Sequence, residues 1–140
     1  MRGAGRLCGL AMLLAASGCA RVVQPMTCAA GMGPPVIVFT LYFGESIGGR
    51  RDLTDTEWQR FLDGTVTPNL PNGYTVWDAR GAWMNPMTRK TIKEATKVLA
   101  VALPVNEASL DTVNRIRDAY RIQFHQQIVG MTSAQACGAF

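Results

Sequence analysis

The sequence is poor in charge and in the residues that build metal centres. Charged residues make up 17% of the 140 residues, and the chain has a single histidine. The four cysteines form no CxxC pair and show no Cys/His spacing typical of zinc sites, so we expect neither a metal nor a cofactor. With a hydrophobic fraction of 48%, the chain has too little charge for disorder and enough apolar material for one domain with its own core.

The apolar run at the N-terminus is too short to span a bilayer and is typical of a signal peptide. It covers Leu7 to Ala16 and ends in LLAASGCA. This ending resembles the lipobox of bacterial lipoproteins, although Ala16 stands where a leucine is usual. The resemblance implies a signal peptide over residues 1–18 and lipid on Cys19. Ordinary signal cleavage nearby, which gives a soluble secreted protein, is the alternative.

A lipid on Cys19 implies a protein tethered to the bacterial cell envelope. We expect it at the periplasmic side of the outer membrane, with the lipid anchor as its contact with the membrane. Cleavage removes Arg2 and Arg6, so the formal charge falls from +4 to +2. Because a chain so close to neutral is a poor candidate for nucleic-acid binding, a small molecule or an envelope component is the expected partner.

Two cysteines, Cys28 and Cys137, remain for the folded protein in an oxidising compartment. We predict a disulfide between them, with two unpaired thiols as the alternative. The bond would close a loop of about 110 residues and stabilise the fold by about 4–5 kcal/mol on a chain-entropy argument. Residues 19–35 are expected to form a tether and residues 36–140 a single domain.

The patterns of the domain follow the order β-α-β-β-α-β. Strands are expected at residues 36–43, 74–83, 92–103 and from 127 onward, and helices at residues 54–64 and 106–124. The first helix begins with a capping box made by Thr54 and Glu57, and Gly64 is expected to end it. The order predicts a ferredoxin-like α+β fold, with an antiparallel sheet and both helices on one face. In that topology the last strand lies beside the first, which brings Cys137 toward Cys28.

Two helices can cover only one face of such a sheet. The strands at residues 36–43 and 92–103 are nevertheless apolar on both faces, and a bare face of this kind exposes more apolar surface than monomers usually tolerate. We therefore expect the second face to be covered by the tether, by the C-terminal tail through Phe140, or by a second subunit in a homodimer.

One motif suggests catalysis. GESIG matches the G-x-S-x-G nucleophile elbow, and Ser46, Asp78 and His125 follow the chain order of a hydrolase triad. The expected helix does not begin directly at the serine, so the motif also fits a plain glycine-rich loop. The sequence does not decide whether the protein is an enzyme. It favours a non-catalytic binding or interaction module, with a small hydrolase using Ser46 and His125 as the alternative.

A second candidate site lies on the second and third expected strands, at residues 74–83 and 92–103. Asp78, Arg80 and Glu94 meet there if these strands pair suitably, either as a polar ligand site or as a cross-strand ion pair. Trp77 and Trp83 share one strand face, which makes either a shallow aromatic slot or, as we expect, core beneath the helices.

A basic run follows this tryptophan pair. It comprises Arg89, Lys90, Lys93 and Lys97. The run fits contact with an anionic surface, and it also fits a solvated strand edge, which we favour. Lys97 completes the candidate ligand-binding set.

Four segments carry a family resemblance: LYFGESIGG, TPNLPNGYTVWDARGAW, EATKVLAVAL and IRDAYRIQFHQQIV. Their order resembles a group of short bacterial exported proteins that form a domain of unknown function. The resemblance covers about residues 39–129 and implies an exported bacterial domain without implying any activity. An acidic residue is common in that group where this chain has Gln127, so no role for a carboxylate is expected there.

Overall fold

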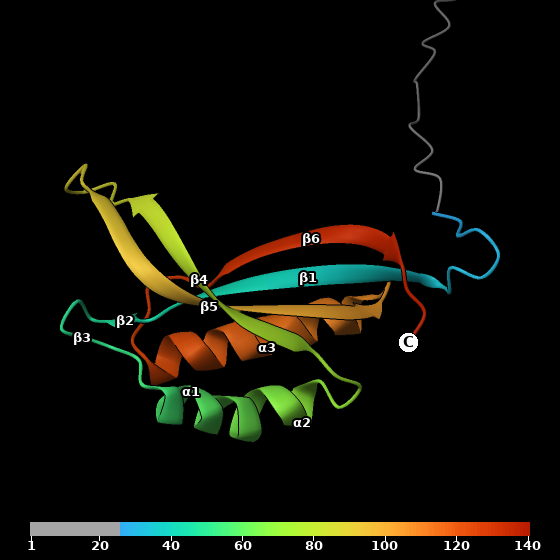
Figure 1. The fold of residues 1–140 in the computed structure, drawn as a ribbon, viewed down its shortest axis with the longest axis horizontal. Coiled ribbons are helices and arrows are strands. Elements are labelled where there is room, and N and C mark those ends of the chain that lie inside the picture. The colour runs from blue at the N-terminus through green and yellow to red at the C-terminus, as the bar shows by residue number, and fades with distance from the viewer. Residues whose placement is uncertain (1–25) are drawn as a thin grey trace, which may run out of the picture.

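The computed structural model describes residues 26–140 and shows one α+β domain built on a four-stranded antiparallel sheet (Figure 1). The strands are β1 (Pro35–Gly44), β4 (Thr75–Met84), β5 (Thr91–Pro104) and β6 (Gly130–Cys137), in the spatial order β4-β5-β1-β6. This order is that of the ferredoxin-like fold, so the predicted fold class is confirmed. The signal peptide, Cys19 and the first part of the predicted tether lie outside the described residues.

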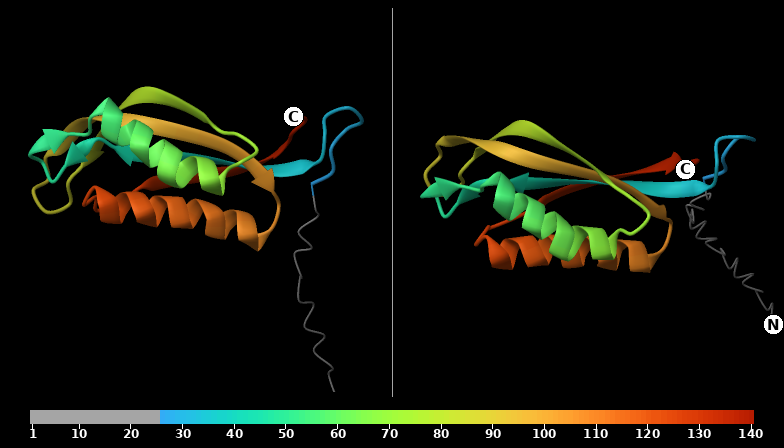
Figure 2. Two further views of the ribbon diagram at one scale, coloured as in Figure 1. Left: turned by 90° about the horizontal axis from the view of Figure 1, so that it is seen from below. Right: turned by 60° about the horizontal axis from the view of Figure 1, so that its bottom comes forward.

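Both helical segments lie on one face of the sheet (Figure 2). The first consists of α1 (Asp55–Phe61), a π-helical turn η1 (Leu62–Val66) and a short α2 (Thr67–Asn69), and the second is α3 (Glu107–Gln123). The predicted end of the first helix at Gly64 is wrong, because the chain continues as η1 and α2. Pro68 lies in the first turn of α2, directly after the π-helical turn, and its ring leaves the preceding turn without one N–H donor.

An aromatic cluster fills the space between the sheet and the helices. Its rings are contributed by β1, α1 and α3, and their centroids lie between 4.7 and 6.3 Å apart. The members are Phe43, Trp58, Phe61, Tyr120 and Phe124. Mostly tilted and edge-to-face contacts of this kind stabilise a core beyond the area that they bury. The cluster fixes the end of β1 against the helices.

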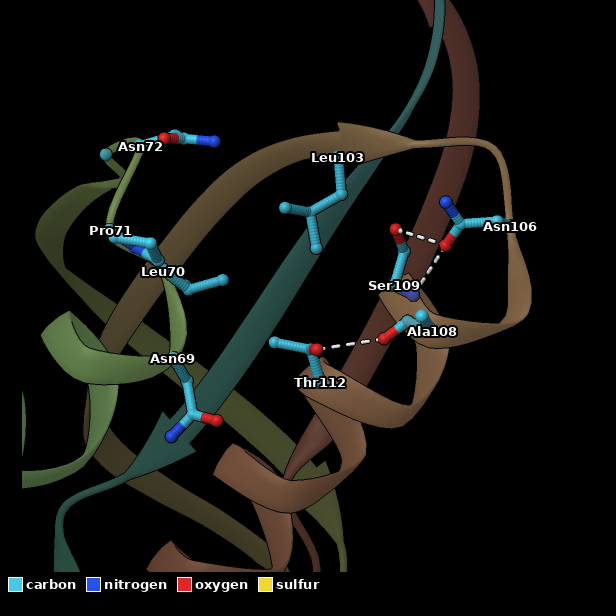
Figure 3. Close-up of a pocket in the computed structure, with 10 residues that line it drawn as sticks. Asn69, Leu70, Pro71, Asn72, Leu103, Asn106, Ala108, Ser109 and Thr112 are labelled. Atoms are coloured by element: carbon cyan, nitrogen blue, oxygen red, sulfur yellow. Dashed lines mark hydrogen bonds between the residues drawn. The ribbon is translucent and has the colours of Figure 1, made fainter.

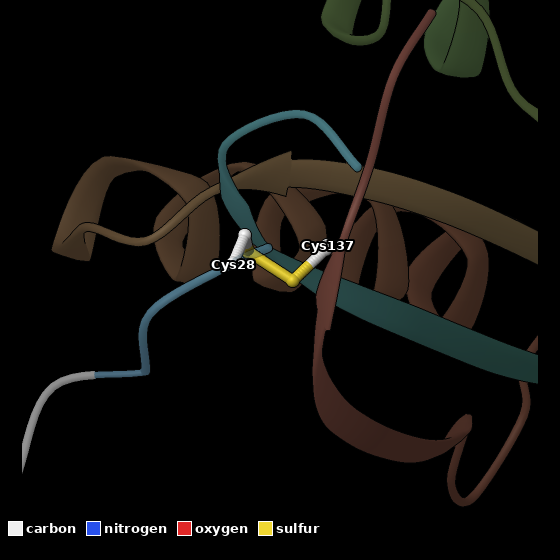
Figure 4. Close-up of a disulfide and its surroundings, with 2 residues drawn as sticks. All are labelled: Cys28 and Cys137. Atoms are coloured by element: carbon white, nitrogen blue, oxygen red, sulfur yellow. A yellow bond between two sulfur atoms is a disulfide. The ribbon is translucent and has the colours of Figure 1, made fainter. Parts of the chain in front are cut away.

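The two ends of the domain are joined by the predicted disulfide, which the structure confirms (Figure 4). Cys28 and Cys137 are 109 positions apart in the sequence, and their Cα atoms lie 5.8 Å from each other. They meet because β6 pairs antiparallel with β1, with Cys137 opposite Pro35. The bond joins residue 28 to the end of β6.

The sheet face turned away from the helices is called the open face below. The C-terminal tail covers only one end of it: Gly138 lies against Val36, which is buried, whereas Phe140 is fully exposed. Trp77 and Trp83 lie on this face, 46% and 40% exposed, so their expected place in the core is wrong. The helix-facing side of β4 contributes Val76 to the core instead.

Within residues 26–140, no helix combines the length and the apolar character that crossing a membrane requires.

Candidate functional site

A groove of about 620 Å³ lies on the open face, at the end of the sheet where β1 stops. Beyond that point the hairpin of β4 and β5 rises away from the helices (Figure 1). The groove is bounded by this hairpin, by the loop around β2 (Ser46–Ile47) and β3 (Arg51–Asp52), and by the segment that joins α3 to β6. Three separate parts of the chain therefore form its walls.

Glycines from three strands make the floor of the groove. A Cβ atom on Gly44 would lie 2.8 Å from Oε2 of Glu94, and one on Gly130 would lie 3.3 Å from the Tyr42 side chain. Gly81 lies between them and the hairpin wall. Because these positions carry no side chain, the Glu94 carboxylate and the Tyr42 ring can lie close to the backbone of the sheet.

One exposed aromatic residue contacts the carboxylate of Glu94, and a second lines the groove elsewhere. The indole Nε1–H of Trp83 donates a hydrogen bond to Oε1 of Glu94 at 3.0 Å. Trp83 and Tyr42 are each 40% exposed. Among the described residues that line the groove, Glu94 alone has a formal charge, and it forms no ion pair with any residue of 26–140. The groove therefore presents a negative charge beside the indole of Trp83, and the Tyr42 ring lines another part of it.

The core holds the groove in place from the helix side. The hydroxyl of Tyr120 donates a hydrogen bond of 2.8 Å to the carbonyl oxygen of Gly44, and burial raises the pKa of that hydroxyl. Gln126 donates from Nε2 to the carbonyl oxygen of Ser46 at 2.9 Å. These bonds join α3 and the segment after it to the floor and wall of the groove, so its geometry is fixed by packed side chains.

Residues 39–140 match a family described as proteins of unknown function, DUF3574. The chain belongs to this family. No curated protein matches the sequence. The membership of an uncharacterised family that the four sequence segments predict is thereby confirmed.

The DUF3574 domain is also similar in fold to solved structures of low sequence identity. A phage SAM lyase in complex with S-methyl-5'-thioadenosine superposes with a TM-score of 0.59 at 12% identity, over 82% of this chain and 90% of that one. Its apo form gives a TM-score of 0.55 at 14% identity, over 81% and 90%. CutA from Synechococcus elongatus gives 0.46 at 8% identity, over 74% and 80%. The likeness to the two lyase structures supports the fold alone.

All four segments that carry the family resemblance reach the groove. Gly44 and Ser46 come from the first segment, Trp83 from the second, Glu94 from the third and Gln126 from the fourth. Sequence reasoning had selected Trp83 and Glu94 as ligand-binding candidates, and the structure brings these two together. It had not selected the glycine floor, because only the strand register shows which glycines are neighbours.

The predicted triad is not assembled in the DUF3574 domain. Ser46 and His125 line the same groove, but no hydrogen bond joins their side chains in the described part of the chain. Asp78 lies on the helix-facing side of the sheet, bonded to Lys97. Ser46 belongs to β2, which pairs with β3, so the serine does not sit on a turn leading directly into a helix as a nucleophile elbow requires.

The expected cluster of Asp78, Arg80 and Glu94 does not form either. Glu94 is opposite Gly81 in the β4–β5 register and shares the open face with it, while Asp78 is opposite Lys97. Adjacent residues of a strand point to opposite faces, so Asp78 and Glu94 lie on different sides of the sheet. Arg80 is exposed.

Lys97 has a structural role rather than the solvated one expected from the basic run. It is 7% exposed, and its Nζ donates to Asp78 at 2.7 Å and to Asp55 at 3.2 Å. The hydrogen bond to Asp78 is the main cause that raises the pKa of Lys97. Burial raises the pKa of nearby Glu45, an effect that the positive charge of Lys97 opposes. The cluster joins the start of α1 to β4 and β5.

A smaller hollow of about 210 Å³ lies between α2 and the start of α3 (Figure 3). Polar side chains that line it form hydrogen bonds at the start of α3. Oδ1 of Asn106 accepts hydrogen bonds from the N–H of Ser109 at 2.9 Å and from its hydroxyl at 3.0 Å, and the hydroxyl of Thr112 donates to the carbonyl of Ala108 at 2.8 Å. Since hydrogen bonds within the start of α3 occupy these groups, the hollow is a weaker candidate than the open-face groove.

No group of three or more His, Cys, Asp or Glu residues in the described range is placed to hold a metal ion.

Proposed function

We propose that this DUF3574 protein is a lipoprotein of the bacterial envelope and that its folded domain is a non-catalytic binding module. The groove of the open face is its binding site. One observation carries the proposal: the unpaired carboxylate of Glu94 lies over a glycine floor beside the exposed Trp83, in a groove that Tyr42 also lines. Concave sites with aromatic walls and a few polar groups are typical of small-molecule binding. Among the described residues of the groove, the Ser46 hydroxyl is not hydrogen-bonded to the His125 side chain, which supports binding over catalysis.

Ligand binding in the groove can be tested by the fluorescence of the tryptophans of β4. We expect a small molecule that binds to change the tryptophan fluorescence of the Trp77→Phe variant, in which Trp83 lines the groove and the other remaining tryptophan, Trp58, is buried in the core. Trp77→Phe is the matched control, because both residues are exposed on the same face of the same strand. A screen of neutral, cationic and anionic small molecules against the whole chain with Cys19→Ser provides the ligands. Binding that is equally strong in the Trp83→Phe and Trp77→Phe variants would show that the site lies elsewhere.

The anchor is proposed from the N-terminal sequence, where two arginines precede an apolar run and small residues precede Cys19. In a bacterial host, the wild-type protein should fractionate with membranes, and Cys19→Ser should appear in the soluble periplasmic fraction. Mass spectrometry of the wild-type N-terminus should find a lipid-modified cysteine. Equal recovery of both proteins in the soluble fraction would contradict the anchor.

The alternative is a small hydrolase that uses Ser46 and His125. We retain it because both residues line the groove. The two functions differ in the reactivity of the serine hydroxyl. We expect a fluorophosphonate probe to leave Ser46 unlabelled, because no base is bonded to it in the described structure. Labelling that disappears in both Ser46→Ala and His125→Ala would favour the enzyme instead.

A further inference from the structure

We propose that the groove of the open face selects a small organic cation, of the alkylammonium or quaternary ammonium class. This inference rests on the proposed binding function and specifies its ligand. It begins with charge: Glu94 is the only formally charged residue among the described residues that line the groove. Its carboxylate has no cationic partner within residues 26–140. A bound cation would supply that partner.

The aromatic residues favour the same class of ligand. The hydrogen bond from Nε1 of Trp83 to Glu94 fixes the edge of the indole against the carboxylate and leaves the ring, which is 40% exposed, available for contact. Tyr42 lies over Gly130 on another side of the groove. Aromatic faces attract ammonium groups, with tryptophan the strongest, and a neighbouring carboxylate adds to the attraction.

The basic side chains near this end of the sheet do not compensate Glu94. Lys97 is buried on the opposite side and is already paired with Asp55 and Asp78. Lys93 lies opposite Ala82 and therefore alternates with Glu94, pointing to the other face. An anionic ligand would meet the Glu94 carboxylate without any cationic group among the lining residues, so the groove disfavours it.

The size of the groove agrees with a ligand of this kind. A volume of about 620 Å³ falls within the usual range for small-molecule pockets, about 300–1,000 Å³. The glycine floor contributes to selection, because it allows the ligand to approach the carboxylate that lies above Gly44.

The experiment measures binding by titration calorimetry to the whole chain with Cys19→Ser. The probes are choline, its uncharged isostere 3,3-dimethyl-1-butanol, and the anion isovalerate. Choline and the alcohol have almost the same shape, so a difference between them reports the charge. We expect choline to bind at least about tenfold more tightly than the alcohol, and isovalerate to bind more weakly than both.

Variants locate the effect. Glu94→Gln keeps an oxygen that accepts from Trp83 but removes the charge, and should weaken choline binding about tenfold while leaving the alcohol unchanged. Glu107→Gln, an exposed glutamate at the start of α3, removes the same net charge and should have no effect. Trp83→Phe should weaken choline binding, and Trp77→Phe should not.

Three results would overturn the inference. They are equal affinity for choline and the alcohol, no binding of choline at millimolar concentration, and an equal loss in Glu94→Gln and Glu107→Gln. None of them decides the proposed function. That function fails separately, if no molecule from the screen of all charge classes changes the fluorescence of Trp83.

Discussion

At the scale of single residues, His125 has an unusual backbone for its type. Its φ angle is 52°, in the left-handed region, directly after Phe124, the C-cap of α3. Glycine is the usual residue at such helix ends, because a side chain there is strained. Histidine adopts this conformation more often than most residues do, and here it also lines the groove. A residue kept at a strained position beside a candidate site points to a role in the site.

Replacing His125 by glycine should therefore separate stability from binding. We expect His125→Gly to raise the free energy of unfolding by up to about 1 kcal/mol and to weaken binding of a groove ligand. Arg89, with φ 57° in the β4–β5 hairpin, lies outside the groove residues. Arg89→Gly should relieve similar strain without any change in affinity. Urea unfolding and calorimetry measure both quantities, and a destabilised His125→Gly protein would contradict the strain argument.

At the scale of elements, the start of α1 shows how a local motif acquires tertiary partners. The capping box of Thr54 and Glu57 was readable in the sequence and is present. Arg51, six residues before Glu57, adds two hydrogen bonds to the same carboxylate, at 2.7 and 2.8 Å. The bonds from Arg51, and then those from Thr54, lower the pKa of Glu57 to about 2.

This lowered pKa predicts how pH changes stability. The pKa of Glu57 is below its ordinary value of 4.5 in the folded state, so its contribution is fully present above the unfolded pKa. It is lost as pH falls toward about 2. Thermal unfolding of the wild type should therefore lose stability over this range more steeply than Glu57→Gln, which should be less stable at neutral pH. Glu107→Gln, in the first turn of α3, is the control and should follow the wild type.

At the scale of the whole molecule, the disulfide joins segments that are far apart in the sequence. It connects the residues before β1 to the end of β6, across 109 positions. The Cys28→Ser/Cys137→Ser variant should lose up to about 4–5 kcal/mol of unfolding free energy, because the unfolded chain regains the entropy of an open loop. Denaturant unfolding measures the loss. An unchanged unfolding free energy, or two alkylatable thiols in the freshly exported protein, would contradict a stabilising bond.

The homodimer, one of the three covers considered for the apolar open face, stays a prediction. The tail covers Val36 but leaves Phe140 fully exposed beside a wide groove at that end of the sheet. We expect sedimentation velocity to show a dimer and Phe140→Asp to shift it to the monomer. Since Phe140 is exposed in the single chain, the substitution should leave the unfolding free energy of the monomer unchanged, and any loss should be limited to the contribution of dimerisation. A wild-type protein that stays monomeric at all concentrations would contradict this prediction.

The sequence by itself determined the features that depend on short-range patterns. The order of strands and helices, the caps at Thr54 and Asn106, and the apolar strand over residues 36–43 follow from local preferences and periodicity. The order of elements then constrained the topology, and the topology brought Cys28 and Cys137 together. Gly64 was misread because packing of Val66 and Leu70 in the core kept the chain helical beyond it.

Only the tertiary structure decided the site. Strand register placed Glu94 opposite Gly81 and Lys97 opposite Asp78, and a shift of one residue would have sent each side chain to the other face. The same register put Trp83 on the open face beside Glu94. The paired residues of β4 and β5 are separated along the chain by a turn, and no local sequence pattern gives the length of that turn. The groove is therefore a product of how the strands pair, which no single segment of the sequence specifies.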